Sequence, residues 1–314
     1  MDNKEIGAIF QLFDKVFKCL MRLSDRAIIH FINGLFGTQY PPDSKLTRPG
    51  TETVNPYLKH SLADMVMVIN REYSYVLEAQ IKNDPDMGVR ILQYMLNEGW
   101  RGAQVEGSGI RIRLPAARVI YWETSKGTPD KERICFEFPD GHTYIYEVVS
   151  FKFPEYSVGM LEAGDLGLLL PFCMLKYRKA VKGAKSREAR EALAKEVGAL
   201  IEEVVGAVRR SEDRGRMSHW DGENVLRLIR RMQRELYGGY KEFREVECMW
   251  EDIEVIDYEG LMRKAEEADR KVEQAIQEKE QATWKAEQAA RKLRKMGVSE
   301  EQVVAAGLLE IAEQ

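Results

Sequence analysis

The 314-residue chain lacks the features that define several common protein classes. No window approaches the roughly 20 consecutive apolar residues that a membrane span needs, and acids and lysines occupy the N-terminus where a signal peptide has an apolar core. The four cysteines, Cys19, Cys135, Cys173 and Cys248, form no CxxC pair, so neither a zinc ribbon nor a disulfide framework is indicated. These absences predict a cytoplasmic protein without a membrane partner and with buried free thiols.

Phosphate-binding glycine loops and histidine-based metal sites are also missing. Gly206 and the pair Gly238-Gly239 lack the strand-to-helix context of a nucleotide-binding loop, so no nucleotide cofactor is expected. The four histidines have no spacing typical of a zinc site or of an HNH motif. The segment His219-Trp220-Asp221 is instead expected at a connection between helices.

Positive charge is not in excess. The net charge of -4 argues against a protein that coats nucleic acid through a global positive field. Between residues 176 and 190, however, seven basic residues are opposed only by Glu188. A solvated helix face is the alternative explanation of such a run. Its candidate contacts to DNA phosphates are Lys176, Arg178, Lys179 and Lys182.

The composition changes twice along the chain. Residues 1–175 mix β-branched and aromatic runs with helical stretches and predict an α/β body, whereas residues 176–258 predict a basic helical region. Residues 259–314 begin with a segment of almost pure Ala, Glu, Gln, Lys and Arg. Its apolar positions from Leu261 to Met296 follow a heptad spacing interrupted by Lys279, which predicts a coiled coil or helical hairpin paired with another chain or with the protein's own body. A capping box at 299–302 opens a short terminal helix.

Helices and strands alternate in the predicted body. An apolar stripe from Ile6 to Leu20 predicts a first helix with one buried face. Asp84 and Pro85 supply a cap and a first-turn proline for a helix from Asp86 to Asn97. Strands are predicted at 62–69, 73–81, 117–122, 134–138 and 143–150, with hairpins between the first two and between the last two.

The first hairpin brings two acids together. If residues 70–72 form its loop, Ile69 pairs with Tyr73, and Asp64 then lies directly opposite Glu78. Paired positions have Cβ atoms ~5 Å apart, so two carboxylates there repel unless a cation lies between them. The alternative is a pair of edge acids on a solvated face, or a register shifted by one residue. Because the strands are otherwise strongly apolar, the buried arrangement is favoured.

A hard divalent cation, Mg²⁺ or Mn²⁺, is the expected cofactor of this acid pair. Such ions bind carboxylate oxygens, backbone carbonyls and waters, which suits Asp64, Glu78 and the carbonyl of Ala79. Strand periodicity places Gln80 on the same face as Glu78. A site of this kind activates water and stabilises charge at phosphorus.

Several short motifs occur in the order found in the bacterial recombination-promoting nuclease/putative transposase (Rpn) family of the PD-(D/E)XK nuclease superfamily. The resemblance covers roughly residues 10 to 175. The matching segments are Asp14-Lys15-Val16-Phe17-Lys18, Ala63-Asp64-Met65, Leu77-Glu78-Ala79-Gln80, Met87 to Met95 with its Arg90 and Tyr94, and Leu114-Pro115 with Val119-Ile120-Tyr121.

This resemblance implies a restriction-endonuclease-like fold, a mixed central sheet flanked by helices, and metal-dependent cleavage of DNA. It implies catalytic roles for Asp64, Glu78 and Gln80, with Gln80 in place of the superfamily's usual lysine and orienting a water. Asp14 is a further candidate metal ligand, with a solvated position as the alternative.

The helix after the hairpin and the residue beyond Gln80 supply supporting positions. Arg90 is expected to offset negative charge at the scissile phosphate. Lys82 is expected to restore the missing positive charge. Gln93 and Tyr94 accompany Arg90 on the helix, Tyr94 chiefly through packing.

The sequence therefore predicts a Mg²⁺-dependent DNA endonuclease, linked to recombination or mobile elements and dimeric through its helical tail. The alternative is a weakly active or inactive nuclease-fold protein that serves as a DNA- or protein-binding assembly module. The missing lysine and the long helical extension favour that alternative.

Overall fold

The computed structural model describes residues 3–49 and 65–253. The chain divides into two compact units, residues 1–255 and 256–314. The predicted coiled coil and terminal helix lie outside the described residues and stay predictions. Among the described residues, no helix has both the length and the apolar content needed to cross a membrane.

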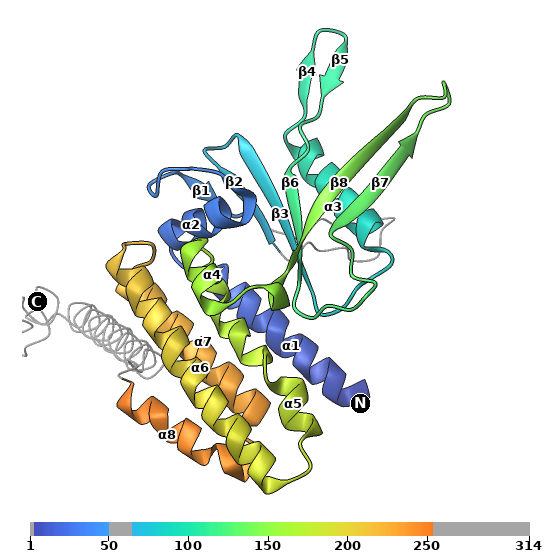
Figure 1. The fold of residues 1–314 in the computed structure, drawn as a ribbon. Coiled ribbons are helices and arrows are strands. Elements are labelled where there is room, and N and C mark those ends of the chain that lie inside the picture. The colour runs from blue at the N-terminus through green and yellow to red at the C-terminus, as the bar shows by residue number, and fades with distance from the viewer. Residues whose placement is uncertain (1–2, 50–64, 254–314) are drawn as a thin grey trace, which may run out of the picture. The chain divides into compact units, whose positions relative to one another are not determined.

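A mixed six-stranded sheet in the order β1-β2-β3-β6-β8-β7 forms the centre of the first unit (Figure 1). β3, β6 and β8 are parallel neighbours, and the outer pairs are antiparallel. The strands are β1 (Leu46–Thr47), β2 (Met65–Ile69), β3 (Tyr73–Gln80), β6 (Ala116–Tyr121), β7 (Lys131–Glu137) and β8 (Thr143–Lys152). The coarse prediction of an α/β fold with a mixed sheet flanked by helices is confirmed.

The first predicted hairpin has the predicted register. Ile69 pairs with Tyr73, and Met65 pairs with Leu77. The loop is a tight turn in which Asn70 and Arg71 have positive φ angles of 53° and 59°. Because one residue of slip would exchange the two faces of each strand, this turn decides which side chains face each helix layer.

Alternating residues of β3 face two different apolar cores. Leu77 packs in the main core with α1 (Asn3–Leu20) and α2 (Asp25–Phe36), whereas Val76 packs in a smaller core with α3 (Met87–Arg101). Figure 1 shows α3 on the opposite side of the strands from α1 and α2. The apolar stripe predicted for the first helix is buried at Phe13, Val16, Phe17 and Leu20. Helix α2 was not predicted from the sequence.

The start of α3 corrects the predicted cap. The helix begins at Met87 after Asp86, which occupies the cap position without a side-chain hydrogen bond, and it runs one turn beyond the predicted end. Asp84 is not the cap. Its carboxylate accepts a hydrogen bond from the backbone N–H of Asp86 at 3.0 Å and another from Arg90.

An aromatic stack joins the sheet to the segment that follows it. Trp122, directly after β6, stacks on Phe172 with ring centroids 3.7 Å apart, and Phe17 and Phe153 contact Trp122 edge-on. Phe153 opens the 3-10 helix η1 (Phe153–Glu155), and the helix α4 (Val158–Ala163) and the 3-10 helix η2 (Gly167–Leu175) follow. Large rings in contact bury much apolar area at fixed geometry, so this stack anchors one end of the sheet.

The C-terminal helices of the first unit complete the main core. They are α5 (Arg178–Gly183), α6 (Arg187–Asp213), α7 (His219–Tyr237), η3 (Lys241–Phe243) and α8 (Arg244–Asp252). Buried residues of α6 and α7, such as Ile201 and Ile229, belong to the same apolar cluster as those of α1 and α2. The helices in this region were predicted, and their packing against the N-terminal helices was not.

Asp221 links the first turn of α7 to the start of α2. The side chain is fully buried, and its carboxylate accepts hydrogen bonds from the backbone N–H and hydroxyl of both Ser24 and Ser218, at 2.6–2.9 Å. Ser218 and Asp221 form a reciprocal capping box. Residues 219–221, expected at a helix connection, form the first turn of α7, directly after the connection from α6.

A small two-stranded ribbon, β4 (Gln104–Glu106) with β5 (Gly109–Arg111), connects α3 to β6 and projects from the sheet (Figure 1). Every residue in both strands is exposed. The ribbon was not predicted, because no alternation of apolar and polar residues marks it in the sequence.

The expectation of buried free thiols holds only for Cys173, where burial raises the pKa of the thiol to about 12. Cys19, Cys135 and Cys248 are exposed, because each lies on the solvent side of a helix or strand. The prediction is wrong for these three residues.

The aromatic stack around Trp122 is expected to contribute strongly to the free energy of unfolding. Replacing Phe172→Ala leaves a cavity against Trp122, so we expect the free energy of unfolding to fall by about 3–5 kcal/mol in urea denaturation. Tyr144→Ala, at a side chain that is 61% exposed, is the control and should change it by less than about 0.5 kcal/mol. Equal losses in the two variants would contradict this account of the core.

Candidate functional site

Glu78 is a fully buried carboxylate on β3, one of the three parallel strands. Its Oε1 atom accepts a hydrogen bond from Nε2 of Gln80 at 2.8 Å and a charged hydrogen bond from Nη2 of Arg90. Period two of the strand places Glu78 and Gln80 on the face that α3 covers. A charge in this position requires a partner, because burial without one costs several kcal/mol.

Arg90 holds two acids at once. Its Nη1 atom donates to Asp84 at 2.8 Å, and its Nε and Nη2 atoms each lie 3.4 Å from the hydroxyl of Tyr94. Burial opposes the charge of Arg90, but the neighbouring Glu78 carboxylate raises the pKa of the guanidinium above its ordinary value. Arg90 is therefore a fixed cation, one helical turn from Tyr94, which is itself buried.

A pocket of about 290 Å³ opens onto this ion pair. Asp14 and Phe13 of α1 line one side of it, and Glu78, Gln80 and Arg90 line another. The structure therefore brings together side chains from α1, β3 and α3 that are far apart in the sequence. Asp14 is about half exposed and forms an ion pair with Lys18 at 2.8 Å, so its carboxylate is accessible from solvent.

Of the other predicted site residues, Ala79 is the one that the structure places at this pocket. Asp64 lies outside the described residues, so its pairing with Glu78 stays a prediction. Ala79 lines the pocket. Lys82 is exposed beyond the end of β3, and Gln93 is half-buried on α3; neither belongs to the described residues that line the pocket.

Two of the four basic residues predicted to contact DNA form ion pairs within the fold. Arg178 and Lys179 both form ion pairs with Glu123, that of Lys179 at 2.9 Å. Burial of Glu123 opposes its charge, but these two cations lower the pKa of the carboxyl below its ordinary value. Lys176 lies over the ring of Tyr177 at 5.2 Å and remains exposed, as does Lys182.

A second, larger cavity of about 680 Å³ shares the side chain of Trp122 with the pocket. Its wall includes residues 122–124 and 153–158, which directly follow the carboxyl ends of β6 and β8. Open α/β sheets bind ligands in the crevice at the carboxyl ends of parallel strands. The cavity was not predicted from the sequence, where its signal is a strand followed by aromatic residues, at Tyr121-Trp122 and at Phe151 to Phe153.

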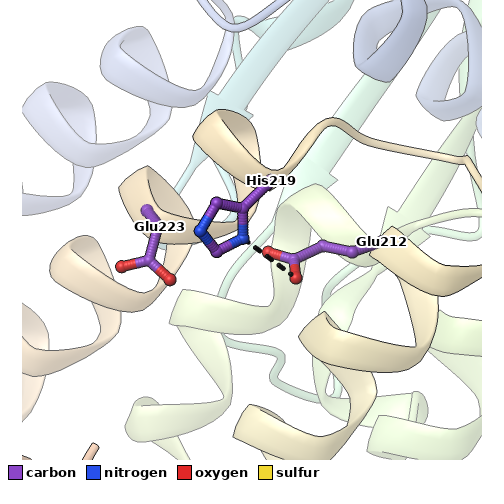
Figure 2. Close-up of side chains that lie close together, drawn as sticks. All are labelled: Glu212, His219 and Glu223. Carbon is purple, nitrogen blue, oxygen red and sulfur yellow. Dashed lines mark ion pairs between the residues drawn. The ribbon is translucent and has the colours of Figure 1, made fainter. Parts of the chain in front are cut away.

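A separate cluster of ligand-type side chains lies where α6 meets α7. Figure 2 shows Glu212, His219 and Glu223, whose ligand atoms lie within 4.8 Å of one another. Arg209 already donates to both carboxylates, at 3.2 Å from Glu212 and 2.7 Å from Glu223. The guanidinium therefore supplies the positive charge that a metal ion would bring, and the cluster works as an ionic contact between the two helices.

Chemically, the pocket combines hard oxygen donors with a fixed cation. The carboxylates of Glu78 and Asp14 and the backbone carbonyl of Ala79 are the ligand types that Mg²⁺ and Mn²⁺ prefer. The guanidinium of Arg90 matches the geometry of a phosphate. No protein family, curated protein or solved structure was found to match the chain.

Glu78 and Arg90 are expected to show strong energetic coupling in the free energy of unfolding, because they form a buried ion pair. Arg90→Leu leaves the Glu78 carboxylate buried without its cation, so we expect the free energy of unfolding to fall by about 3 kcal/mol. The double variant Glu78→Gln, Arg90→Leu should recover most of that loss, because no buried charge remains. Urea denaturation of both variants measures the difference.

Arg187→Leu provides the matched control. This arginine also pairs with a glutamate, Glu191, but its side chain is 78% exposed, so we expect a change below about 1 kcal/mol. If Arg90→Leu and the double variant are equally destabilised, Glu78 does not depend on Arg90 for its burial.

Proposed function

We propose that the chain is a divalent-metal-dependent nuclease that hydrolyses phosphodiester bonds of DNA. One observation carries the proposal: the fully buried Glu78 carboxylate on β3 lines a solvent-accessible pocket together with Asp14, Gln80 and Arg90. Buried acids beside a cation in a pocket are typical of catalytic sites, because burying charge costs stability that packing alone does not require.

The donor set suits a hard divalent cation. Glu78, Asp14 and the Ala79 carbonyl supply oxygen ligands from two elements, and Asp64 would supply another if the register of β2 and β3 continues past Met65. When bound, Mg²⁺ or Mn²⁺ would activate a water and offset charge on the phosphate.

The protein's own residues position the substrate and the attacking water. The planar guanidinium of Arg90, held by Asp84 at 2.8 Å, is oriented to pair with a phosphate oxygen. The amide nitrogen of Gln80 is 2.8 Å from Glu78. Its amide oxygen is a hydrogen-bond acceptor for the attacking water. Because glutamine carries no charge, Arg90 takes the place of the superfamily's usual lysine as the cation of the site.

A second candidate function is a catalytically inactive module that binds DNA or protein. The observation that favours it is the direct pairing of Arg90 with Glu78, which neutralises the buried carboxylate without any metal. A cation would have to share or displace that contact. In this alternative the ion pair is structural and the surface of the fold carries the function.

The remaining expectations belong to the same proposal. Membership of the Rpn family, a link to recombination or mobile elements, a cytoplasmic location in bacteria and a homodimer formed through residues 259–314 rest on the sequence motifs and the heptad spacing.

Nicking of supercoiled plasmid tests the proposed activity. We expect the full chain to nick plasmid with Mg²⁺ or Mn²⁺ and to lose activity in EDTA. Glu78→Gln and Asp64→Ala should each lower the rate about 100-fold or more, because each removes a charged metal ligand. Glu137→Gln, an exposed acid on β7, is the matched control and should retain the full rate.

The outcomes separate the two functions. Nicking that persists unchanged in Glu78→Gln contradicts the catalytic assignment. If none of the proteins nicks plasmid and the full chain still binds DNA, the module is supported instead.

A further inference from the structure

A groove of about 440 Å³ lies at the other end of the α3 face from the Glu78 pocket. Four arginines line it: Arg71 from the β2–β3 turn, Arg101 from the end of α3, and Arg111 and Arg113 from the ribbon and the segment after it. Among the described residues, the acids that line it are Glu72 and Glu98. Three separate elements thus direct positive charge into one concave surface.

The base of the ribbon is held firmly against α3. Gly99 of α3 packs so closely on residues 112–114 that an added Cβ would lie 2.9 Å from Ile112 and 3.0 Å from the carbonyl oxygen of Arg113. This close approach fixes the backbone at Arg111 and Arg113 relative to Arg101.

Arg101 is already paired with the buried Glu98 at 3.3 Å, so the exchangeable cations of the groove are Arg71, Arg111 and Arg113. Arg113 is 3.4 Å from Glu72 with both side chains more than half exposed, and Arg111 pairs with Glu106, which does not line the groove. Arg71 forms no ion pair with a described residue. Exposed pairs contribute about 0–1 kcal/mol, so an incoming phosphate replaces them at little cost.

We propose that this arginine groove binds the sugar-phosphate backbone of duplex DNA. The β4–β5 ribbon then enters the DNA groove that lies beside the bound backbone. Guanidinium groups bind phosphate oxygens in pairs of parallel hydrogen bonds. The ribbon is exposed on both strands and projects from the body (Figure 1). The major groove of B-DNA is wide enough for a two-stranded ribbon, which favours a duplex over an acidic peptide.

This inference rests on the proposed function, because it assigns a second contact to the same DNA substrate. Ser74 lines the groove and lies on β3 four residues before Glu78, on the same strand face. At ~3.3 Å per residue the two positions are ~13 Å apart, which equals roughly four base pairs along a duplex. One bound duplex is thus long enough to reach both places.

Fluorescence anisotropy with a labelled 20-base-pair duplex in EDTA tests the proposal without cleavage. We expect the triple variant Arg71→Ala, Arg111→Ala, Arg113→Ala to bind at least about tenfold more weakly than the unaltered chain. The slope of log affinity against log salt should become shallower by about two to three, because each lost phosphate contact removes about 0.9 from it. Urea denaturation of the variant checks that it remains folded.

The matched control removes the same charge elsewhere: Lys195→Ala, Arg231→Ala, Arg244→Ala, at exposed positions of α6, α7 and α8. Equal weakening in both triple variants would overturn the inference, because net charge alone would then explain binding. Competition by polyglutamate at the same charge concentration as the duplex would also overturn it, in favour of an acidic protein partner.

Failure of the inference is distinguishable from failure of the nuclease proposal. If the unaltered chain nicks plasmid and the groove variant binds the duplex normally, the nuclease proposal stands and the groove proposal is wrong. If the unaltered chain does not nick plasmid, and the groove variant loses duplex binding while the control variant does not, the groove proposal stands and the nuclease proposal is wrong.

Discussion

The need to neutralise one buried carboxylate governs the arrangement around the centre of the sheet. Glu78 has no exposed surface, and the guanidinium that compensates it comes from α3. Arg90 reaches Glu78 only if the helix starts close to the carboxyl end of β3, and Asp84, in the short connection, holds the other side of the same guanidinium. The connection, the helix start and the strand face together place Arg90 within reach of both Glu78 and Asp84.

The three parallel strands place both cavities at one edge of the sheet. β3 ends at Gln80 beside the Glu78 pocket, and β6 and β8 end beside the larger cavity, with Trp122 between them. Because Trp122 also stacks on Phe172, the wall that separates the cavities is part of the main core. Packing and site geometry are coupled here, so a change in the aromatic stack would alter both cavities.

Local sequence patterns predicted the parts of the fold that depend on short-range geometry. The loop from Asn70 to Glu72 determined the hairpin register, and the apolar stripe identified the buried face of the first helix. The meeting of Asp14 with Glu78 at one pocket was proposed only through the family resemblance, because sequence spacing carries no distance between α1 and β3. Pairing across 55 residues, as between Arg178 and Glu123, and a ribbon without a buried face leave no periodic signal, so neither was predicted.

The buried Asp221 carboxylate ties the start of α2 to the start of α7 through two hydrogen bonds from Ser24, across 197 residues of sequence. Removing the later helices would leave Ser24 without this acceptor and would uncover the apolar side of α1 and α2. A fragment ending near residue 175 would thus lack part of its own interior. The sheet with its pocket and the helices that follow belong to one compact unit and share one apolar core, so the pocket depends on helices that lie far from it in the sequence.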